Sequence, residues 1–239
     1  MEIPKNIILF WHDKIAMPAD FNKCITMTMK SHSGFELIFS DDDDVKKIIR
    51  NEFSQFIDLY ERNRIPASRS DIARLILLYK FGGIYFDMSM EFYKPLSDII
   101  SMKENLVLVR RDDLPQFKNN PENAHFINGI IASPPRSNFI LHCLKKIYFN
   151  LSSGIHNYYV TIATGPIVIT EAITEKRNAI NFTPLSFSVL KENYFKSRKI
   201  AGISNRWVKM QGDGIIDSAH YDQKGLLDEV WQKFQFPPG

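Results

Sequence analysis

The chain has 239 residues, of which 44% are hydrophobic and 13% aromatic, enough to form a full core in one domain spanning residues 1–239. Its 30 basic and 27 acidic residues leave a net charge of +3, which argues against a nucleic-acid-binding protein, since these carry a clear excess of Lys and Arg. Two cysteines without a metal-binding pattern favour a reduced, cytoplasmic setting, with a single disulfide as the alternative.

The N-terminal part of the chain alternates strands and helices. Strands are predicted over residues 3–11 and 35–39, and helices over residues 21–31 and 45–60. The acidic run from Asp41 to Asp44 stands where the second helix should begin, and carboxylates there complement the helix dipole. Because four consecutive carboxylates cannot converge on one ion, this role is favoured over metal binding.

The stretch from Ser68 to Glu91 contains the densest pattern. Ser68 is predicted to cap a helix, with Asp71 three residues later as in a capping box. Apolar residues then recur at helical spacing, so one face of this helix should be buried. Asp71 and Arg74 are three positions apart and should lie together on the helix surface.

The same stretch continues through a glycine turn into a strand. Gly82 and Gly83 end the helix, because glycine accepts the positive φ that a helix terminus often needs. Residues 84–86 read as a short buried strand that carries Asp87 to its carboxyl end. In open α/β sheets ligands bind at that end, so this helix–turn–strand unit is a candidate site.

The second half of the chain continues the alternation. Strands are expected over residues 106–109 and 125–133, with a loop over 110–122 between them. Helices are expected over residues 138–148 and 167–175, and a loop with a short helix over 189–195. Asn128 precedes Gly129, a pair that also fits a turn. Gly165 and Pro166 have the order of a helix start, for which a structural role is favoured, although helix N-termini also bind anions.

The spaced pattern S-D-x-x-R, followed by L-Y-x-x-G-G-I-Y-x-D, resembles glycosyltransferase family 32, the sugar transferases with a DXD motif. That family includes fungal initiating mannosyltransferases and bacterial capsule and lipopolysaccharide transferases, and the clostridial glucosylating toxins are more distantly similar. An initial I-P-K, a K-P-L after the central stretch and a later G-P extend the similarity. The resemblance implies an α/β, Rossmann-like nucleotide-sugar-binding domain of the GT-A type, with a mixed central sheet flanked by helices.

The resemblance also implies roles for individual residues. Asp71, Arg74 and Asp87 are the expected catalytic residues, with the first two holding the donor sugar and Arg74 also near the diphosphate. The expected donor-binding residues are Trp11, Ser70, Tyr85, Asn128 and Gly165. Trp11 would stack on the nucleotide base, and ordinary core packing is the equal alternative. Asn128 would face the donor sugar or the acceptor.

The second acid of the DXD motif is replaced by Ser89, a much poorer ligand than a carboxylate. Family members bind Mn²⁺ or Mg²⁺ to neutralise the diphosphate, so the expected metal ligands here are Asp87, Ser89 and His220. His220 resembles the His-containing end of the family, although Trp231 follows 11 residues later, farther than expected. Arg74, Arg206 or Lys209 could instead replace the metal's charge, or catalysis could be lost.

We therefore expect a retaining glycosyltransferase that uses a UDP- or GDP-sugar and a glycan or lipid-linked glycan acceptor, in bacterial capsule or lipopolysaccharide synthesis. A cytoplasmic location fits the N-terminal apolar run, which is too short for a signal peptide or a membrane span. Basic residues in the C-terminal part suggest peripheral contact with an anionic membrane, with a solvated face as the plainer reading. A non-catalytic nucleotide-sugar-binding subunit is the alternative, and a hydrolase using paired carboxylates is more distant.

Overall fold

The computed structural model describes residues 1–117, 119–176, 179–198 and 206–216. Its strands are β1 (Asn6–Phe10), β2 (Glu36–Ser40), β3 (Gly83–Phe86), β4 (Met90–Phe92), β5 (Val107–Arg110), β6 (Phe126–Ser133), β7 (Thr183–Ser186) and β8 (Phe195–Ser197). Its helices are α1 (Ala19–Ser31), α2 (Asp42–Glu52), α3 (Ile57–Glu61), α4 (Pro66–Phe81), α5 (Asn138–Ser153), α6 (Val160–Ala163), α7 (Pro166–Lys176), α8 (Phe187–Asn193) and α9 (Arg206–Met210). Within these residues no helix is long and apolar enough to cross a bilayer.

The main sheet is mixed, as predicted, and its strand order is β2-β1-β3-β6-β5-β7. Strand β1 is parallel to β2 and β3, while β6 runs antiparallel to both β3 and β5. Strand β7 is parallel to β5. The carboxyl ends of β1, β3, β5 and β7 therefore meet the start of β6 at one edge of the sheet, where ligands of α/β proteins bind.

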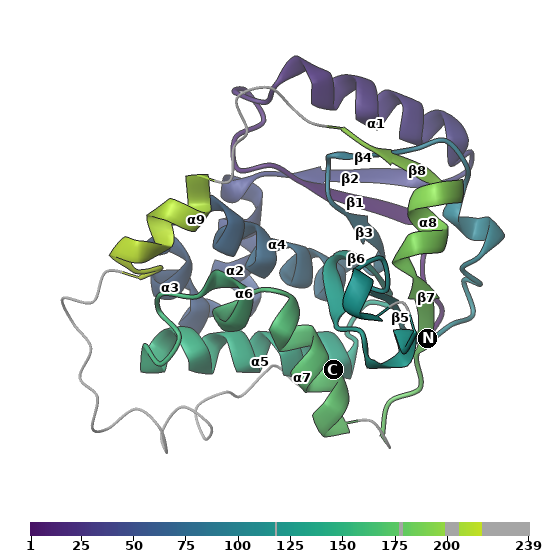
Figure 1. Cartoon of the computed structure of the whole chain (residues 1–239). Helices are drawn as coiled ribbons and strands as arrows, with labels where there is room; N and C mark the ends of the chain where they lie inside the picture. Colours follow the sequence, from purple (N-terminus) through teal and green to yellow (C-terminus); the bar gives the residue numbers. More distant parts are fainter. Residues whose placement is uncertain (118, 177–178, 199–205, 217–239) are drawn as a thin grey trace.

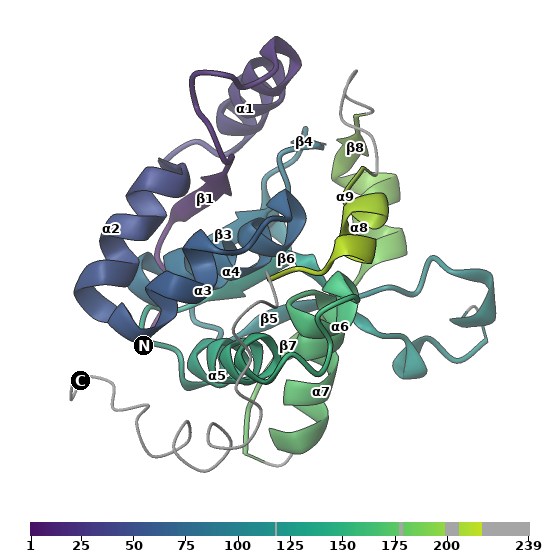
Figure 2. The ribbon, with the colours of Figure 1, turned by 90° about the vertical axis from the view of Figure 1, so that its left-hand side faces the viewer.

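Helices cover both faces of this sheet (Figures 1 and 2). On one face α2, α4, α5 and α7 bury the larger apolar cluster against the strands. On the other face α1, α8 and the small β4–β8 sheet form the second cluster. Figure 1 shows α1 above the strands and α5 and α7 below them.

The start of α4 differs from the prediction. The helix begins at Pro66 with Ile65 at the N-cap position and no side-chain cap, because proline is already set to helical φ at the first position. Ser68 is not a cap: it is buried inside the first turn, where its hydroxyl accepts a hydrogen bond from Asn63 (2.7 Å). The capping-box role assigned to Asp71 is likewise wrong, and its carboxylate is used elsewhere.

The helix expected over residues 45–60 is divided. Its start is confirmed, since Asp41 caps α2 and forms a reciprocal capping box with Asp44. The helix then ends at Glu52, and the fully buried Phe53, with φ −141° and ψ 43°, leaves helical geometry. A 3-10 turn and α3 follow, so burial of aromatic side chains overrides a continuous helix here.

Three short strands were missed, namely β4, β7 and β8. Strand β7 extends the main sheet, and β8 pairs antiparallel with β4 after α8. Just past β8, Arg198 holds Glu91 through two hydrogen bonds of 2.9 and 2.8 Å and donates its backbone N–H to Ser89 (2.8 Å). Asn128 and Gly129 lie within β6 rather than in a turn. His220 lies outside the described residues.

Candidate functional site

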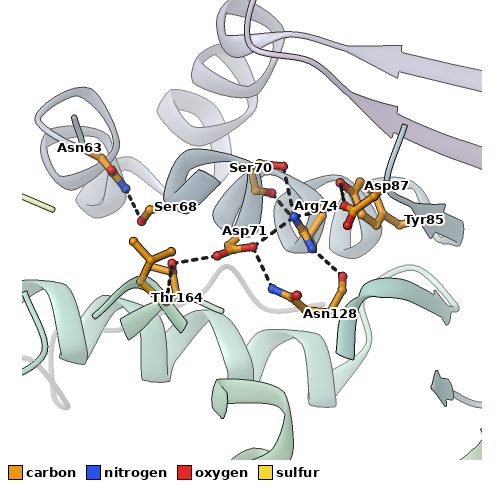
Figure 3. A network of polar contacts seen from close by, with 10 residues as sticks. Asn63, Ser68, Ser70, Asp71, Arg74, Tyr85, Asp87, Asn128 and Thr164 are labelled. Carbon is orange, nitrogen blue, oxygen red and sulfur yellow. Dashed lines mark hydrogen bonds and ion pairs between the residues drawn. The ribbon is translucent and has the colours of Figure 1, made fainter. Parts of the chain in front are cut away.

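Arg74 on α4 is the centre of a buried polar network at the carboxyl end of β3 (Figure 3). Its Nε donates to the carbonyl of Ser70 (3.2 Å), and its Nη1 donates to the carbonyl of Asn128 (2.7 Å). Its Nη2 reaches Ser70 Oγ (3.2 Å) and lies 3.1 Å from Asp71 and 3.4 Å from Asp87. One guanidinium therefore joins α4, β3 and β6.

The carboxylate of Asp71 lies beneath this guanidinium and is almost covered, with a side-chain exposure of 9%. Asn128 Nδ2 donates to its Oδ1 (2.8 Å), and Thr164 Oγ1 donates to its Oδ2 (3.0 Å). Burial raises the pKa of Asp71 to about 6, despite the opposing effects of Arg74 and of the hydrogen bond from Thr164. Asp71 is thus held in place by Arg74 on its own helix and by Asn128 and Thr164 from two other parts of the chain.

Asp87 is the accessible acid of the network, with 40% of its side chain exposed. The buried Tyr85 donates its hydroxyl to Asp87 Oδ1 (3.1 Å), and the Arg74 guanidinium stacks on the Tyr85 ring at 4.8 Å. Burial raises the pKa of Tyr85, so its hydroxyl stays protonated and keeps this hydrogen bond. Burial lowers the pKa of Arg74, but Tyr85 and the carboxylates of Asp87 and Asp71 outweigh that effect and raise it above its usual value.

Gly129 allows Asp87 to take this position. The pairing of β5 with β6 slips near Leu108 and Val109, so β6 is irregular where it passes the network. There the backbone N–H of Asp87 donates to the carbonyl of Gly129 (2.9 Å). A Cβ at position 129 would lie only 2.7 Å from Asp87 Oδ2, which is too close for two non-bonded atoms. The carboxylate therefore packs on bare backbone, a requirement that the sequence pattern did not reveal.

Thr164 is a second residue that sequence reasoning missed. It ends α6, is 2% exposed, and contributes the hydrogen bond to Asp71 from 93 positions away along the chain. The neighbouring Gly165 is buried, and a Cβ there would lie 2.8 Å from the Thr161 backbone. Gly165 therefore allows α6 and α7 to approach closely, which agrees with the structural role favoured from the sequence and puts Thr164, not Gly165, in the network.

Trp11 lies apart from this network, just beyond the end of β1 at the same edge of the sheet. Its ring packs against Phe21 (4.8 Å between centroids) and is half-buried. Its indole Nε1 is buried and has no hydrogen-bond partner among the described residues. The residue is therefore part of the second apolar cluster and also presents an unused donor.

Ser89 lies in the turn between β3 and β4 and is half-buried. Among the described residues no three His, Cys, Asp or Glu side chains are grouped so as to hold a metal ion. Asp87 and the Ser89 hydroxyl are hard oxygen donors, the kind that Mn²⁺ and Mg²⁺ accept, but they need oxygens from a ligand or water to complete the coordination. The described residues thus fit a divalent ion only as part of a shared site.

The arrangement is suited to hydroxyl-rich ligands. Carboxylate oxygens accept more than one hydrogen bond each, and Asn128 offers both a donor and an acceptor. Asp71 and Arg74, which are buried, hold Asp87 and Asn128, which are half-buried. The structure therefore brings together six of the predicted residues, Ser70, Asp71, Arg74, Tyr85, Asp87 and Asn128, and leaves Trp11 and Gly165 outside their network.

Known proteins show similarity to parts of this chain. Residues 18–106 match the family described as "Glycosyltransferase sugar-binding region containing DXD motif". "Uncharacterized glycosyltransferase L373" of Acanthamoeba polyphaga mimivirus is 27% identical over 169 residues, which is 70% of this chain and 63% of that protein. "Inositol phosphoceramide mannosyltransferase 1" of Schizosaccharomyces pombe is 22% identical over 177 residues, 71% of this chain and 50% of that protein. This chain thus spans less than two thirds of either relative.

A solved structure is similar as well. The chain titled "PaToxG Glycosyltransferase" superposes with a TM-score of 0.57 at 21% sequence identity, over 73% of this chain and 70% of that one. At this identity the likeness shows the fold, and the GT-A fold expected from the motif is confirmed.

Proposed function

We propose that this chain transfers a sugar from a nucleotide-sugar donor to a hydroxyl of a glycan or lipid-linked glycan acceptor, because residues 18–106 match the glycosyltransferase family whose sugar-binding region contains a DXD motif. The observation that supports the proposal best is the network around Arg74, which holds Asp71, Asp87 and Asn128 together at the carboxyl end of β3. Local sequence alone would not bring Asn128 to this network, since it lies 57 positions from Asp71.

In this proposal Asp87 and Asn128 accept and donate hydrogen bonds to the donor's hydroxyl groups, while Asp71, Arg74 and Ser70 hold them in position. The half-buried indole of Trp11 stacks on the base. Tyr85 acts through Asp87, because its own ring is only 1% exposed. Rate enhancement then comes mainly from positioning and from stabilising the departing charge.

The transfer step itself follows from the resemblance to retaining enzymes. The acceptor oxygen bonds to the anomeric carbon as the bond from that carbon to the diphosphate oxygen breaks. The acceptor's proton passes to the departing diphosphate oxygen, so attack and departure share one face of the sugar. No step then requires a separate protein nucleophile.

Mn²⁺ or Mg²⁺ would be held by Asp87 and Ser89 together with the donor's diphosphate, and would neutralise the leaving group's charge. Arg74 is a poor substitute for that charge, since its donors already serve Ser70 and Asn128 and its charge faces Asp71 and Asp87. Lys209, the other described candidate, is exposed on α9. A bound metal is therefore the favoured arrangement.

Four of the relatives are named inositol phosphoceramide mannosyltransferase or mannosyl phosphorylinositol ceramide synthase, which makes mannose and a lipid-linked acceptor reasonable first choices for this chain. The relatives described above come from a giant virus and a yeast. Action in bacterial capsule or lipopolysaccharide synthesis, at the cytoplasmic face of a membrane, stays a prediction.

The test is donor turnover. The full chain is incubated with UDP- and GDP-sugars, with and without Mn²⁺, and release of nucleoside diphosphate is measured for the wild type, Asp87→Asn and Asp43→Asn. Asp43 is an acid on α2 that is 82% exposed, so Asp43→Asn is a matched loss of one carboxylate. We expect turnover of one donor, lost in Asp87→Asn and kept in Asp43→Asn. Equal turnover in both variants, or no turnover of any donor with glycan acceptors present, would overturn the proposal.

Ser89 favours one other function, a non-catalytic nucleotide-sugar-binding subunit on the same fold. Calorimetry separates the two functions. A donor that binds without hydrolysis or transfer, and that Ser89→Asp fails to convert into a substrate, would favour the binding subunit.

A further inference from the structure

Arg110 is a cation at the same edge of the sheet that the proposed function does not use. It is the last residue of β5, and β5 lies next to β6 in the sheet. Its guanidinium stacks on the ring of Phe126, the first residue of β6, at 5.3 Å from the ring centroid. Phe126 belongs to the apolar cluster on the α4 side of the sheet, so Arg110 and Asp71 lie on the same face.

Within the described part of the chain, Arg110 forms no ion pair, and its buried Nε has no hydrogen-bond partner. The acids that follow it are committed to other residues. Asp112 accepts hydrogen bonds from the backbone and the hydroxyl of Ser188 (3.0 and 3.1 Å). Asp113 pairs with Arg111 (2.7 Å) and with Lys191 (3.9 Å).

The consecutive residues Arg110 and Arg111 therefore differ in their ion pairing among the described residues. Arg111 has a carboxylate and also stacks on Phe187 at 5.3 Å. Arg110 stacks on the ring of Phe126, which holds its position but does not neutralise its charge. A partly buried guanidinium without an anion costs free energy, because water is removed from its buried Nε and no described group replaces that water. A ligand anion would supply the missing partner.

We propose that Arg110 binds a phosphate-type anion carried by the acceptor, so that the enzyme favours acceptors with a phosphate close to the hydroxyl that receives the sugar. This inference rests on the proposed function. A guanidinium fork matches the oxygens of a phosphate group and binds them with two parallel hydrogen bonds.

The order of the strands assigns this anion to the acceptor rather than to the donor. Along the edge of the sheet Trp11 follows β1, Asp87 follows β3, Asn128 lies in β6 and Arg110 ends β5. With the base on Trp11 and the donor sugar at Asp87 and Asn128, the diphosphate that joins them lies on the β1 side of the sugar. Arg110 lies on the opposite side, three strand spacings or about 14 Å from Trp11.

The test is equilibrium binding of small anionic probes, which needs no turnover. Titration calorimetry on the full chain compares myo-inositol 1-phosphate and mannose 6-phosphate with unphosphorylated myo-inositol and mannose. It is run with saturating UDP and with saturating GDP, each with Mn²⁺, on the wild type, Arg110→Gln, Arg110→Lys and Arg111→Gln. Arg111→Gln is the matched control, because it removes a neighbouring arginine that already has an internal partner.

We expect the wild type to bind at least one phosphorylated probe more tightly than its neutral counterpart. Arg110→Gln should weaken that binding by about 10- to 100-fold, the usual range for a charged hydrogen-bonding partner. Arg110→Lys should retain part of it, and Arg111→Gln should leave it within about twofold. Circular dichroism and thermal melts check that each variant is folded. If Arg110→Gln does not fold, Arg110→Lys is compared with the wild type in its place.

Three results would overturn the inference. The first is equal binding of phosphorylated and neutral probes by the wild type, and the second is equal binding by Arg110→Gln and Arg111→Gln. The third is a loss of 10-fold or more in UDP or GDP binding by Arg110→Gln, which would assign the anion to the donor. Failure of sugar transfer with intact, Arg110-dependent phosphate binding would instead count against the proposed function alone.

Discussion

Replacing Gly129 by Ala should disable the site while leaving the fold intact. The new Cβ would lie 2.7 Å from Asp87 Oδ2 and 3.3 Å from its Cγ, about 0.7 Å short of the 3.4 Å at which ordinary contacts begin. The carboxylate must move away, and the movement strains its contacts with Tyr85 (3.1 Å) and Arg74 (3.4 Å).

The expected loss follows from that displacement. Misplacing a reacting group by about 1 Å costs about 100-fold in rate, so a shift of this size should lower kcat/KM by roughly 10- to 100-fold. The free energy of unfolding should fall by less than about 1 kcal/mol, because Asp87 is 40% exposed and its lost hydrogen bond can be replaced by water.

The assay is steady-state release of nucleoside diphosphate, paired with urea unfolding followed by circular dichroism. Gly212→Ala is the matched control, since a Cβ there meets nothing within 4 Å. If Gly129→Ala kept more than half of the wild-type kcat/KM, the position of Asp87 would not matter to the reaction. If it unfolded the protein instead, Gly129 would be a folding requirement and not a requirement of the site.

Three further predictions concern the same network. The ionised form of Asp71 pairs with Arg74 and accepts a hydrogen bond from Asn128, and burial raises the pKa of Asp71 to about 6. We therefore expect log kcat/KM to rise with pH up to about 6 and to level off above it. A flat profile between pH 4.5 and 7 would contradict this. Thr164→Val removes a hydrogen bond that favours the ionised carboxylate of Asp71, so the pH at which the profile levels off should rise. Thr164→Ser keeps the hydroxyl and should leave that pH unchanged. The pH profiles of both variants are measured, and equal shifts would refute the role of the hydroxyl. Ser89→Asp supplies the second acid of the motif and should lower the Mn²⁺ concentration needed for half-maximal donor turnover by at least about 10-fold. If the Mn²⁺ titration is unchanged, the side chain at position 89 does not reach the ion.

Much of the architecture could be read from local pattern. The apolar runs, the acidic start of α2 and the glycines after α4 act over a few residues, and the predicted β1, β2, β3, β5, β6, α1, α4, α5 and α7 are all present. The errors arise where burial or a single proline decided the outcome. Phe53 interrupts the helix expected over residues 45–60, and Pro66 starts α4 before Ser68 can cap it. The short edge strands β7 and β8 carry too little pattern of their own to be recognised.

The candidate site divides in the same way. Asp71, Arg74 and Asp87 lie within one helix–turn–strand unit, so spacing along the chain is enough to place them together. Thr164 reaches Asp71 from 93 positions away, and Gly129 matters because β6 passes beside Asp87. Arg111 pairs with Asp113, whereas Arg110 has no such acid among the described residues. Contacts of this kind depend on which strands are neighbours and which partners are already taken. Residue type and spacing do not predict these long-range contacts, because they depend on how the chain is folded.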